Sequence, residues 1–269
     1  MKKQLNLQPM IYQEYTPSKQ LTPFIDTYWA SEGFVEGQEL FNVLPDGCVD
    51  IMFSFGCPSK FAFGYPSVKD SLTLLLPNII GTMTTYSEVC YNGKVSMLGI
   101  RFKPVGITAF TRVPVNEFTN QRIDMTLVET LFDEQFYESL PEKKSMKQRI
   151  EHIDAYFAQK LKSIFEPQQQ IVYTVNLIQK TKGRLSLAEV AGEACLSPRH
   201  FERKFKSAVG ISPKAFSKVI KFKHAVSFLN EHKDDSIFSV AVDCGYYDHT
   251  HMIKDFKSLS GNTPSFYRG

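Results

Sequence analysis

The sequence predicts an α+β protein, with a mixed-β N-terminal domain that ends in helices and then an all-α domain with two helix-turn-helix units. Three observations support this prediction. Alternating apolar residues and turn signals dominate up to about Pro114, helical spacing follows, and two similar helix-turn-helix sequences lie about fifty residues apart near the C-terminal end. Because the polar run 166–170 interrupts the helical pattern, we assign residues 1–166 to the first domain and residues 167–269 to the second.

Strands are predicted where apolar residues alternate between turn signals. Residues 50–55 alternate, and residues 95–102 give a further strand whose Ser96, Leu98, Ile100 and Phe102 share a face. The sequence Pro45-Asp46-Gly47 is typical of a turn. Asn92-Gly93 between two apolar triplets predicts a hairpin.

Two helices are expected between Pro114 and the second domain. Leu127, Leu131, Phe136 and Leu140 indicate the first helix. The second, over residues 147–165, carries an apolar stripe of Ile150, Ile153, Phe157, Leu161 and Ile164. One apolar face can be buried only once, against its own β domain or against a second copy of the chain. We favour the second copy, so this helix is expected to form a homodimer; packing on the home domain is the alternative.

The first helix-turn-helix unit begins at Leu187, turns before Leu196 and continues in a helix capped by Ser197 with Pro198 in the first turn. At about 100° per residue, the polar side chains of this second helix fall within one arc of roughly 100°. They are Arg199, Glu202, Arg203 and Lys206. Phe201, Phe205 and Ala208 fall on the opposite side, so the helix has one face to bury and another to present.

The second unit has the same layout. A helix from Ile237 is followed by the turn Cys244-Gly245-Tyr246, and Asp248 is the expected cap of the next helix. Its apolar stripe is Met252, Phe256 and Leu259, and its other faces carry His249, Thr250, Ile253, Lys254 and Lys257. Residues 213–229 between the units have helical spacing, and a helix of that length spans roughly 25 Å.

These faces suit double-stranded DNA. Arginine pairs with guanine, glutamate can accept from the amino group of cytosine, and Lys206 and Lys257 suit phosphates. Residues 167–269 hold 15 lysines and arginines against 9 acidic residues, whereas the net charge of the whole chain is only +3. A basic C-terminal half favours a polyanionic partner. The alternative is a pair of ordinary surface helices whose charges are merely solvated.

Residues from about 168 to 268 resemble the DNA-binding domain of the AraC/XylS transcriptional regulators. The residues that carry the resemblance are Ala241-Val242-Asp243-Cys244-Gly245-Tyr246-Tyr247-Asp248, His251, Phe256-Lys257, Gly261, Thr263-Pro264 and Tyr267-Arg268. The resemblance implies seven helices, with the two recognition helices in successive major-groove faces on one side of the duplex. By position, the base-contacting sites are Arg199, Glu202 and Arg203 in the first helix and His249, Thr250, Ile253 and Lys254 in the second. Cys195 stands where the family often has glycine, and Lys221 where arginine is frequent.

The segments 42–50 and 99–104 are similar to the N-terminal domains of some uncharacterised AraC-like regulators. This resemblance implies a sensing or association role. Trp29 and Arg101 are candidates to line a pocket for a small-molecule effector, with Arg101 binding an anionic group. The alternative is that Trp29 belongs to the core and Arg101 pairs with a structural acid such as Asp46 or Asp50.

Other classes of protein fit less well. The start of the chain lacks the apolar stretch of a signal peptide, no run of eighteen apolar residues exists, and five scattered cysteines indicate a reducing, cytoplasmic compartment. The only histidine before residue 167 is His152, which argues against a metal site, and we expect neither a cofactor nor an enzyme. An effector-responsive regulator is favoured over a ligand-independent one that only dimerises or meets a protein partner. RNA polymerase is a candidate partner. The third hypothesis, and the least favoured, is a ligand-processing enzyme with an accessory DNA-binding domain.

Overall fold

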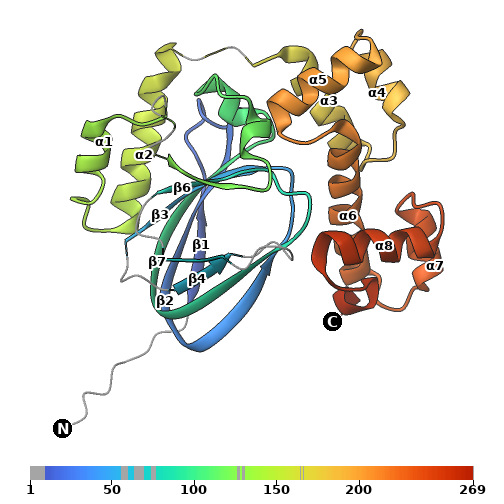
Figure 1. The fold of residues 1–269 in the computed structure, drawn as a ribbon, viewed down its shortest axis with the longest axis horizontal. Coiled ribbons are helices and arrows are strands. Elements are labelled where there is room, and N and C mark those ends of the chain that lie inside the picture. Colours follow the sequence, from blue (N-terminus) through green and yellow to red (C-terminus); the bar gives the residue numbers. More distant parts are fainter. Residues whose placement is uncertain are drawn as a thin grey trace.

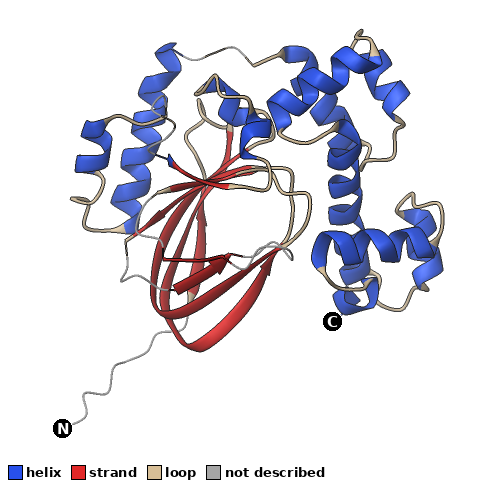
Figure 2. Ribbon diagram, viewed as in Figure 1, coloured by secondary structure: helices blue, strands red, loops and turns tan. Residues whose placement is uncertain are grey.

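The computed structural model describes residues 10–55, 60–63, 70–73, 77–125, 128, 131–163, 165 and 167–268. A β-rich part comes first, and a helical part that follows lies beside it (Figures 1 and 2). The α+β class predicted from the sequence is therefore confirmed.

A six-stranded sheet forms the centre of the N-terminal part, and all its pairings are antiparallel. The strand order is β1-β2-β7-β3-β6-β8. The strands are β1 (Ile11–Tyr15), β2 (Ile25–Val43), β3 (Val49–Ser54), β6 (Asn78–Ile80), β7 (Ser87–Phe102) and β8 (Arg122–Asp124). A separate pair is formed by β4 (Lys60–Phe63) and β5 (Asp70–Thr73). The alternation in β3 and β7 buries Ile51, Phe53, Leu98, Ile100 and Phe102 in one core, as predicted.

The hairpin predicted at Asn92-Gly93 is wrong. Strand β7 runs straight through these residues and stays paired with β2 on both sides of them. The register shifts between Val35 and Glu39, so the glycine lies at an irregularity of the ladder, where its φ is +92°. A bulge uses the left-handed freedom of glycine as a tight turn does, so the dipeptide alone does not separate the two.

Helices cover one side of the sheet (Figure 2). After the short 3-10 turns η1 (Gly106–Ala109) and η2 (Val115–Phe118) come α1 (Glu134–Ser139) and α2 (Met146–Lys160), which continues into η4 (Leu161–Ser163). The first of the two expected helices is shorter than predicted, because the Asp133 side chain caps it by accepting from Phe136 N. Leu131 lies before that cap, and Leu127 lies outside the described residues.

The apolar stripe of α2 packs on its own domain, which corrects our expectation of a dimer contact. Ile150, Ile153 and Phe157 are at most 6% exposed and belong to the same core as the sheet residues. The ring of Phe157 lies 5.7 Å from that of Phe102 and 4.8 Å from that of Phe110. Leu161 is partly buried against this core, and Ile164 lies outside the described residues. This face of α2 is buried within one chain, so it is not available to a second copy.

The C-terminal part consists of six α-helices and a final 3-10 helix among its described residues, which agrees with the seven helices expected. They are α3 (Gln169–Lys180), α4 (Leu187–Glu193), α5 (Pro198–Val209), α6 (Pro213–Glu231), α7 (Ile237–Asp243), α8 (His249–Ser260) and η5 (Pro264–Arg268). One continuous hydrophobic core links all of them and reaches Val105 of the β-rich part. In the described residues, no helix has both the length and the apolar character needed to cross a membrane.

Candidate nucleic-acid interface and effector cavity

The first helix-turn-helix unit is α4 and α5. Ser186 and Glu189 form a reciprocal capping box that starts α4. The turn places Cys195 at a φ of +52°, a left-handed conformation that explains why glycine suits this position. Ser197 occupies the cap of α5 with Pro198 after it, as predicted, but its side chain makes no capping hydrogen bond.

The second unit, α7 and α8, repeats this geometry. Gly245 holds the turn position equivalent to Cys195, with a φ of +78°. Tyr246 N donates to Ala241 O at 2.8 Å, which closes the turn, and Tyr246 itself is buried. The carboxylate of Asp248 accepts from His251 N at 2.6 Å and so caps α8 as predicted.

Each recognition helix buries one face and exposes the other. Phe201, Phe205 and Ala208 of α5, and Met252, Phe256 and Leu259 of α8, are at most 6% exposed. The opposite faces carry exposed Arg199, Glu202, Arg203 and Lys206 on α5, and exposed His249, Thr250, Lys254 and Lys257 with half-buried Ile253 on α8. Of the nine residues that the sequence assigned to DNA, eight are exposed, and Ile253 is half-buried.

Helix α6 joins the two units, and they lie at its two ends (Figure 1). Lys221 Nζ donates to Gly245 O at 2.9 Å, so it supports the turn of the second unit from the connecting helix. Arg184, from the segment before α4, donates to Asp243 O of the same turn. Lys218 Nζ lies 2.9 Å from Asp255 Oδ1, a buried carboxylate of α8 that the sequence analysis did not single out. These contacts fix the second unit to α6 and to the segment before α4.

Trp29 and Arg101 lie together with Asp46 and Asp50. Trp29 Nε1 donates to Asp50 Oδ1 at 3.0 Å, and Arg101 Nε lies 3.4 Å from Asp46 and 3.3 Å from Asp50. Gly99, the partner of Trp29 across the strands, gives the indole its space, since a Cβ there would come within 2.0 Å of the ring. The alternative in which Arg101 pairs with structural acids is therefore confirmed for both candidate aspartates.

Burial and the neighbouring charges act against each other on the pKa values of Asp50 and Arg101. Burial raises the pKa of Asp50 to about 6, although the Arg101 charge pulls the other way. Burial would lower the pKa of Arg101, but the charges of Asp50 and Asp46 outweigh it and raise that pKa above its ordinary value. Both carboxylates lie beside the guanidinium, so Arg101 is already paired and is not a free cation for an anionic ligand.

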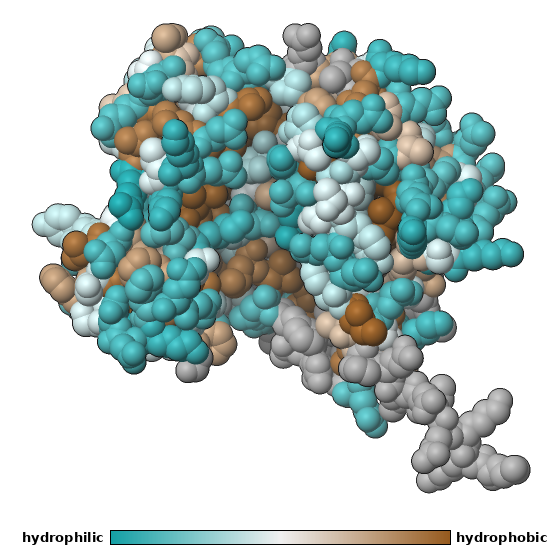
Figure 3. Space-filling model, turned by 180° about the vertical axis from the view of Figure 1, so that it is seen from behind, coloured by the Kyte–Doolittle hydropathy of each residue, from teal (hydrophilic) through white to brown (hydrophobic). Residues whose placement is uncertain are grey.

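Two cavities meet at this cluster. The inner one, of about 80 Å³, is lined by Trp29, Asp50 and Arg101 together with Ile80, Gly81 and Met83. A larger cleft of about 830 Å³ lies between the two parts of the chain and is lined by Lys103 and Val105 on one side and Val172 and Lys223 on the other. Asp46 and Cys48 line both. Apolar residues gather along this boundary (Figure 3). The sequence analysis missed the cleft, because its walls come from segments far apart in the chain.

We expect Asp50→Asn to gain stability relative to the unchanged protein as the pH rises from about 4 to about 7. Because the pKa of Asp50 is raised to about 6, the folded chain keeps a proton that the unfolded chain releases near pH 4, so ionisation opposes folding across this window. The asparagine cannot ionise, and the relative gain should be about 2–3 kcal/mol. Urea unfolding of both proteins at several pH values measures it, and a difference that stays constant with pH would contradict the prediction.

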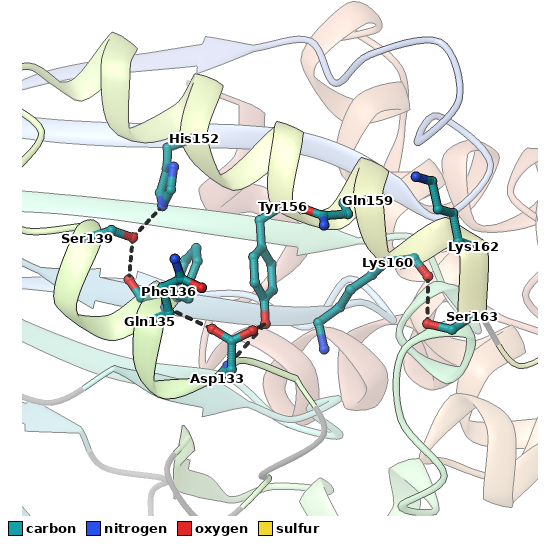
Figure 4. Close-up of a pocket in the computed structure, with 10 residues that line it drawn as sticks. All are labelled: Asp133, Gln135, Phe136, Ser139, His152, Tyr156, Gln159, Lys160, Lys162 and Ser163. Atoms are coloured by element: carbon teal, nitrogen blue, oxygen red, sulfur yellow. Dashed lines mark hydrogen bonds between the residues drawn. The ribbon is translucent and has the colours of Figure 1, made fainter.

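A third pocket, of about 540 Å³, lies over α1 and α2 and contains a serine beside a histidine (Figure 4). Ser139 Oγ lies 2.8 Å from His152 Nε2 and donates to Phe136 O at 3.2 Å, and the Tyr156 hydroxyl donates to Asp133. His152 stacks on the Phe136 ring at 5.5 Å, and burial and Lys143 lower its pKa. A serine nucleophile also needs a group that orients the histidine. These contacts instead hold α1 and α2 against each other.

Comparisons with known proteins agree with this architecture. Residues 190–269 match a family model described as a helix-turn-helix domain, and residues 13–124 match one described as a domain of unknown function (DUF6597). The HTH-type transcriptional regulator MtrA of Neisseria gonorrhoeae is 32% identical over 92 residues, which cover 34% of this chain and 30% of that protein. An uncharacterised HTH-type transcriptional regulator of Haemophilus influenzae is 28% identical over 94 residues, 35% of this chain and 31% of that protein.

The chain thus spans about a third of the length of these curated relatives. Among solved structures, ToxT from Vibrio cholerae is similar at 12% identity with a TM-score of 0.48, over 97% of this chain and 98% of that one. The C-terminal domain of AraT from Geobacillus stearothermophilus is 26% identical with a TM-score of 0.35, over 38% of this chain and 84% of that one. The family model and the named regulators show that residues 190–269 form a helix-turn-helix domain of the kind found in HTH-type transcriptional regulators.

Proposed function

We propose that this chain is a sequence-specific DNA-binding regulator of transcription rather than an enzyme. The observation that carries the proposal is the duplicated unit at the two ends of α6, where each recognition helix buries an apolar face and presents a polar one. Two such units on a rigid spacer suit adjacent turns of one duplex. We infer the same division of labour as from the sequence, with residues 1–166 for sensing or association and residues 167–269 for DNA.

In this proposal, Arg199, Glu202 and Arg203 contact base edges from the first recognition helix. His249, Thr250, Ile253 and Lys254 do so from the second. Lys206 and Lys257, in the last turns of the two helices, contact phosphates. Arginine offers a bidentate contact to guanine, whereas a lysine at a phosphate contributes without regard to sequence.

We further infer that the N-terminal domain takes up a small-molecule effector. The cleft of about 830 Å³ has the size of ordinary ligand pockets, and the Trp29–Arg101 cavity is adjacent to it, since Asp46 and Cys48 line both. Because Arg101 is already paired with two carboxylates, a ligand group at this cluster should be neutral or cationic and should donate hydrogen bonds to the oxygens of Asp46 or Asp50.

The second candidate is a regulator without a small ligand, whose N-terminal domain only meets another protein or a second copy. It is favoured by strand β1, an edge of the sheet where Ile11 is 57% and Tyr12 is 53% exposed. An uncovered edge strand offers unpaired backbone groups to a partner. RNA polymerase is the further partner that a promoter-bound regulator would contact.

We expect both the full chain and residues 168–269 to bind duplex DNA, with an affinity that falls steeply as salt is added. Each phosphate contact releases condensed counterions, so log K should fall linearly with log salt at a slope of about −0.9 per contact. Fluorescence anisotropy on a labelled duplex between low and physiological salt measures the slope. No binding at low salt, or an affinity that salt leaves unchanged, would contradict the proposal.

Selection of bound DNA from a random pool is the decisive experiment for the function. The full-length protein should enrich one sequence with two conserved parts, about one helical turn apart. Repeating the selection with the protein-free, small-molecule fraction of a cell extract separates the two candidates, because only an effector-responsive regulator should change its enrichment when small molecules alone are supplied. Recovery of a random pool in both selections would overturn sequence-specific regulation.

A further inference from the structure

The C-terminal end of the first recognition helix is fastened to the β-rich domain. Thr82 Oγ1 donates to Val209 O at 2.7 Å, and Thr119 Oγ1 donates to Gly210 O at 2.5 Å. Gly210 ends α5 with a φ of +94°, and a Cβ there would lie 2.9 Å from Thr82 Oγ1. The last carbonyls of a helix have no partner within it and carry its negative dipole end, so they accept such donors well.

The second recognition helix is fastened in the same manner. Thr85 Oγ1 donates to Ser258 O at 2.7 Å, and Asn42 Nδ2 donates to Ser260 O at 3.4 Å. Gly261 ends α8 with a φ of +74°, and a Cβ there would come within 2.8 Å of the Tyr86 ring. Figure 1 shows both helices with these ends toward the sheet.

Both sets of contacts involve one short segment, residues 81–86 between β6 and β7, which we call the β6–β7 loop. The loop is braced from behind by Asn120, whose Oδ1 accepts from Thr84 N at 2.8 Å and whose Nδ2 donates to Thr84 Oγ1 at 2.7 Å. Asn120 N also donates to Thr82 O at 3.1 Å. A loop held in this way can keep the two recognition helices in a fixed position relative to the β-rich domain.

We propose that Thr82, Thr85 and Thr119 are positioning residues that set the relative orientation of the two recognition helices, and thereby the half-site spacing that the protein accepts on DNA. The proposal rests on the DNA-binding function proposed above. Helix α6 connects the two units through the shared core, and the β6–β7 loop adds a second connection, because it ties the equivalent ends of α5 and α8 to one rigid body. The exposed polar faces of α5 and α8 remain uncovered by these contacts.

The same loop forms a wall of the inner cavity. Ile80, Gly81 and Met83 line the space beside Trp29 and Arg101, while the neighbouring Thr82 and Thr85 hold the helices. A ligand in this cavity would therefore lie against the segment that holds both recognition helices.

The test compares a triple Thr→Val variant at residues 82, 85 and 119 with the matched triple Thr→Ser variant, which keeps each hydroxyl. Spin labels at Gly192 and Val242, both exposed and one in each unit, report the distance between the units in a cysteine-depleted background. Pulsed dipolar spectroscopy on the free full-length protein is expected to give a narrow distribution for the unchanged and Ser proteins and a clearly broader one for the Val protein. This measurement needs no DNA.

The second measurement uses the selected duplex and versions with one base pair added or removed between its two parts. The unchanged and Ser proteins should lose about tenfold or more in affinity on the altered spacings, and the Val protein less than about threefold. Equal distance distributions in all three proteins would overturn the positioning role, and so would a broadened distribution with unchanged spacing preference. A broadened distance distribution in the Val protein, with no specific DNA binding by any variant, would support the positioning role of the three threonines. It would overturn the proposed DNA-binding function instead.

Discussion

Ile153→Asp is expected to unfold the N-terminal domain, with a loss of about 4 kcal/mol or more in its free energy of unfolding. Ile153 is fully buried in the core that α2 shares with the sheet. Removing its apolar side chain leaves a cavity, and the new carboxylate has no partner there. Urea unfolding followed by far-UV circular dichroism gives the loss.

Lys147→Asp is the matched control, because its side chain lies on the exposed face of the same helix and is 78% exposed. This change should stay within about 0.5 kcal/mol of the unchanged protein. Sedimentation separates folding from assembly. A stable Ile153→Asp protein that merely dissociates from dimer to monomer would show that α2 is an intermolecular contact after all.

The double change Arg199→Ala and Arg203→Ala is expected to remove most of the preference for the selected site. Each bidentate arginine–guanine contact discriminates by about 1–3 kcal/mol, so the pair can contribute up to about 6 kcal/mol. Both side chains are exposed on α5, so their removal leaves the Phe201 and Phe205 core intact. Anisotropy titrations on specific and scrambled duplexes give the ratio of affinities.

Lys257→Ala is the control for that experiment, since we assign this exposed residue of α8 to phosphate. It should weaken binding to specific and scrambled DNA about equally. It should also reduce the slope of log K against log salt by the amount expected for about one phosphate contact. If the arginine and lysine variants lost affinity equally on both duplexes, the division between base and phosphate contacts would be wrong.

The helical half was predictable because local signals and tertiary packing agree there. Asp248 before an apolar stripe indicated where α8 begins, and the predicted connector 213–229 differs from α6 by two residues at one end. The polar arcs of α5 and α8 are exposed because their opposite faces are needed for the core. A helix pattern that repeats twice leaves few other arrangements.

The features that the sequence did not predict depend on contacts between segments far apart in the chain. Nothing local distinguishes the bulge at Gly93 from a hairpin, because both use a left-handed glycine. The stripe on α2 showed that a face would be buried, but not which surface would cover it. The cleft at Lys103 and Lys223 and the bonds from Thr82 and Thr85 join residues more than a hundred positions apart, at separations where sequence pattern carries no information.

The hydrophobic core that runs without a break from α3 to η5 has a consequence for the lifetime of the protein in the cell. Opening either unit would strip the shared face of α6, so amide protons in α4 and α7 should exchange with solvent through one common event. A chain with only one intact unit would then be scarcely populated. Proteases would then encounter the C-terminal part either fully folded or fully opened. A substitution that destabilises one unit should therefore expose both units to degradation.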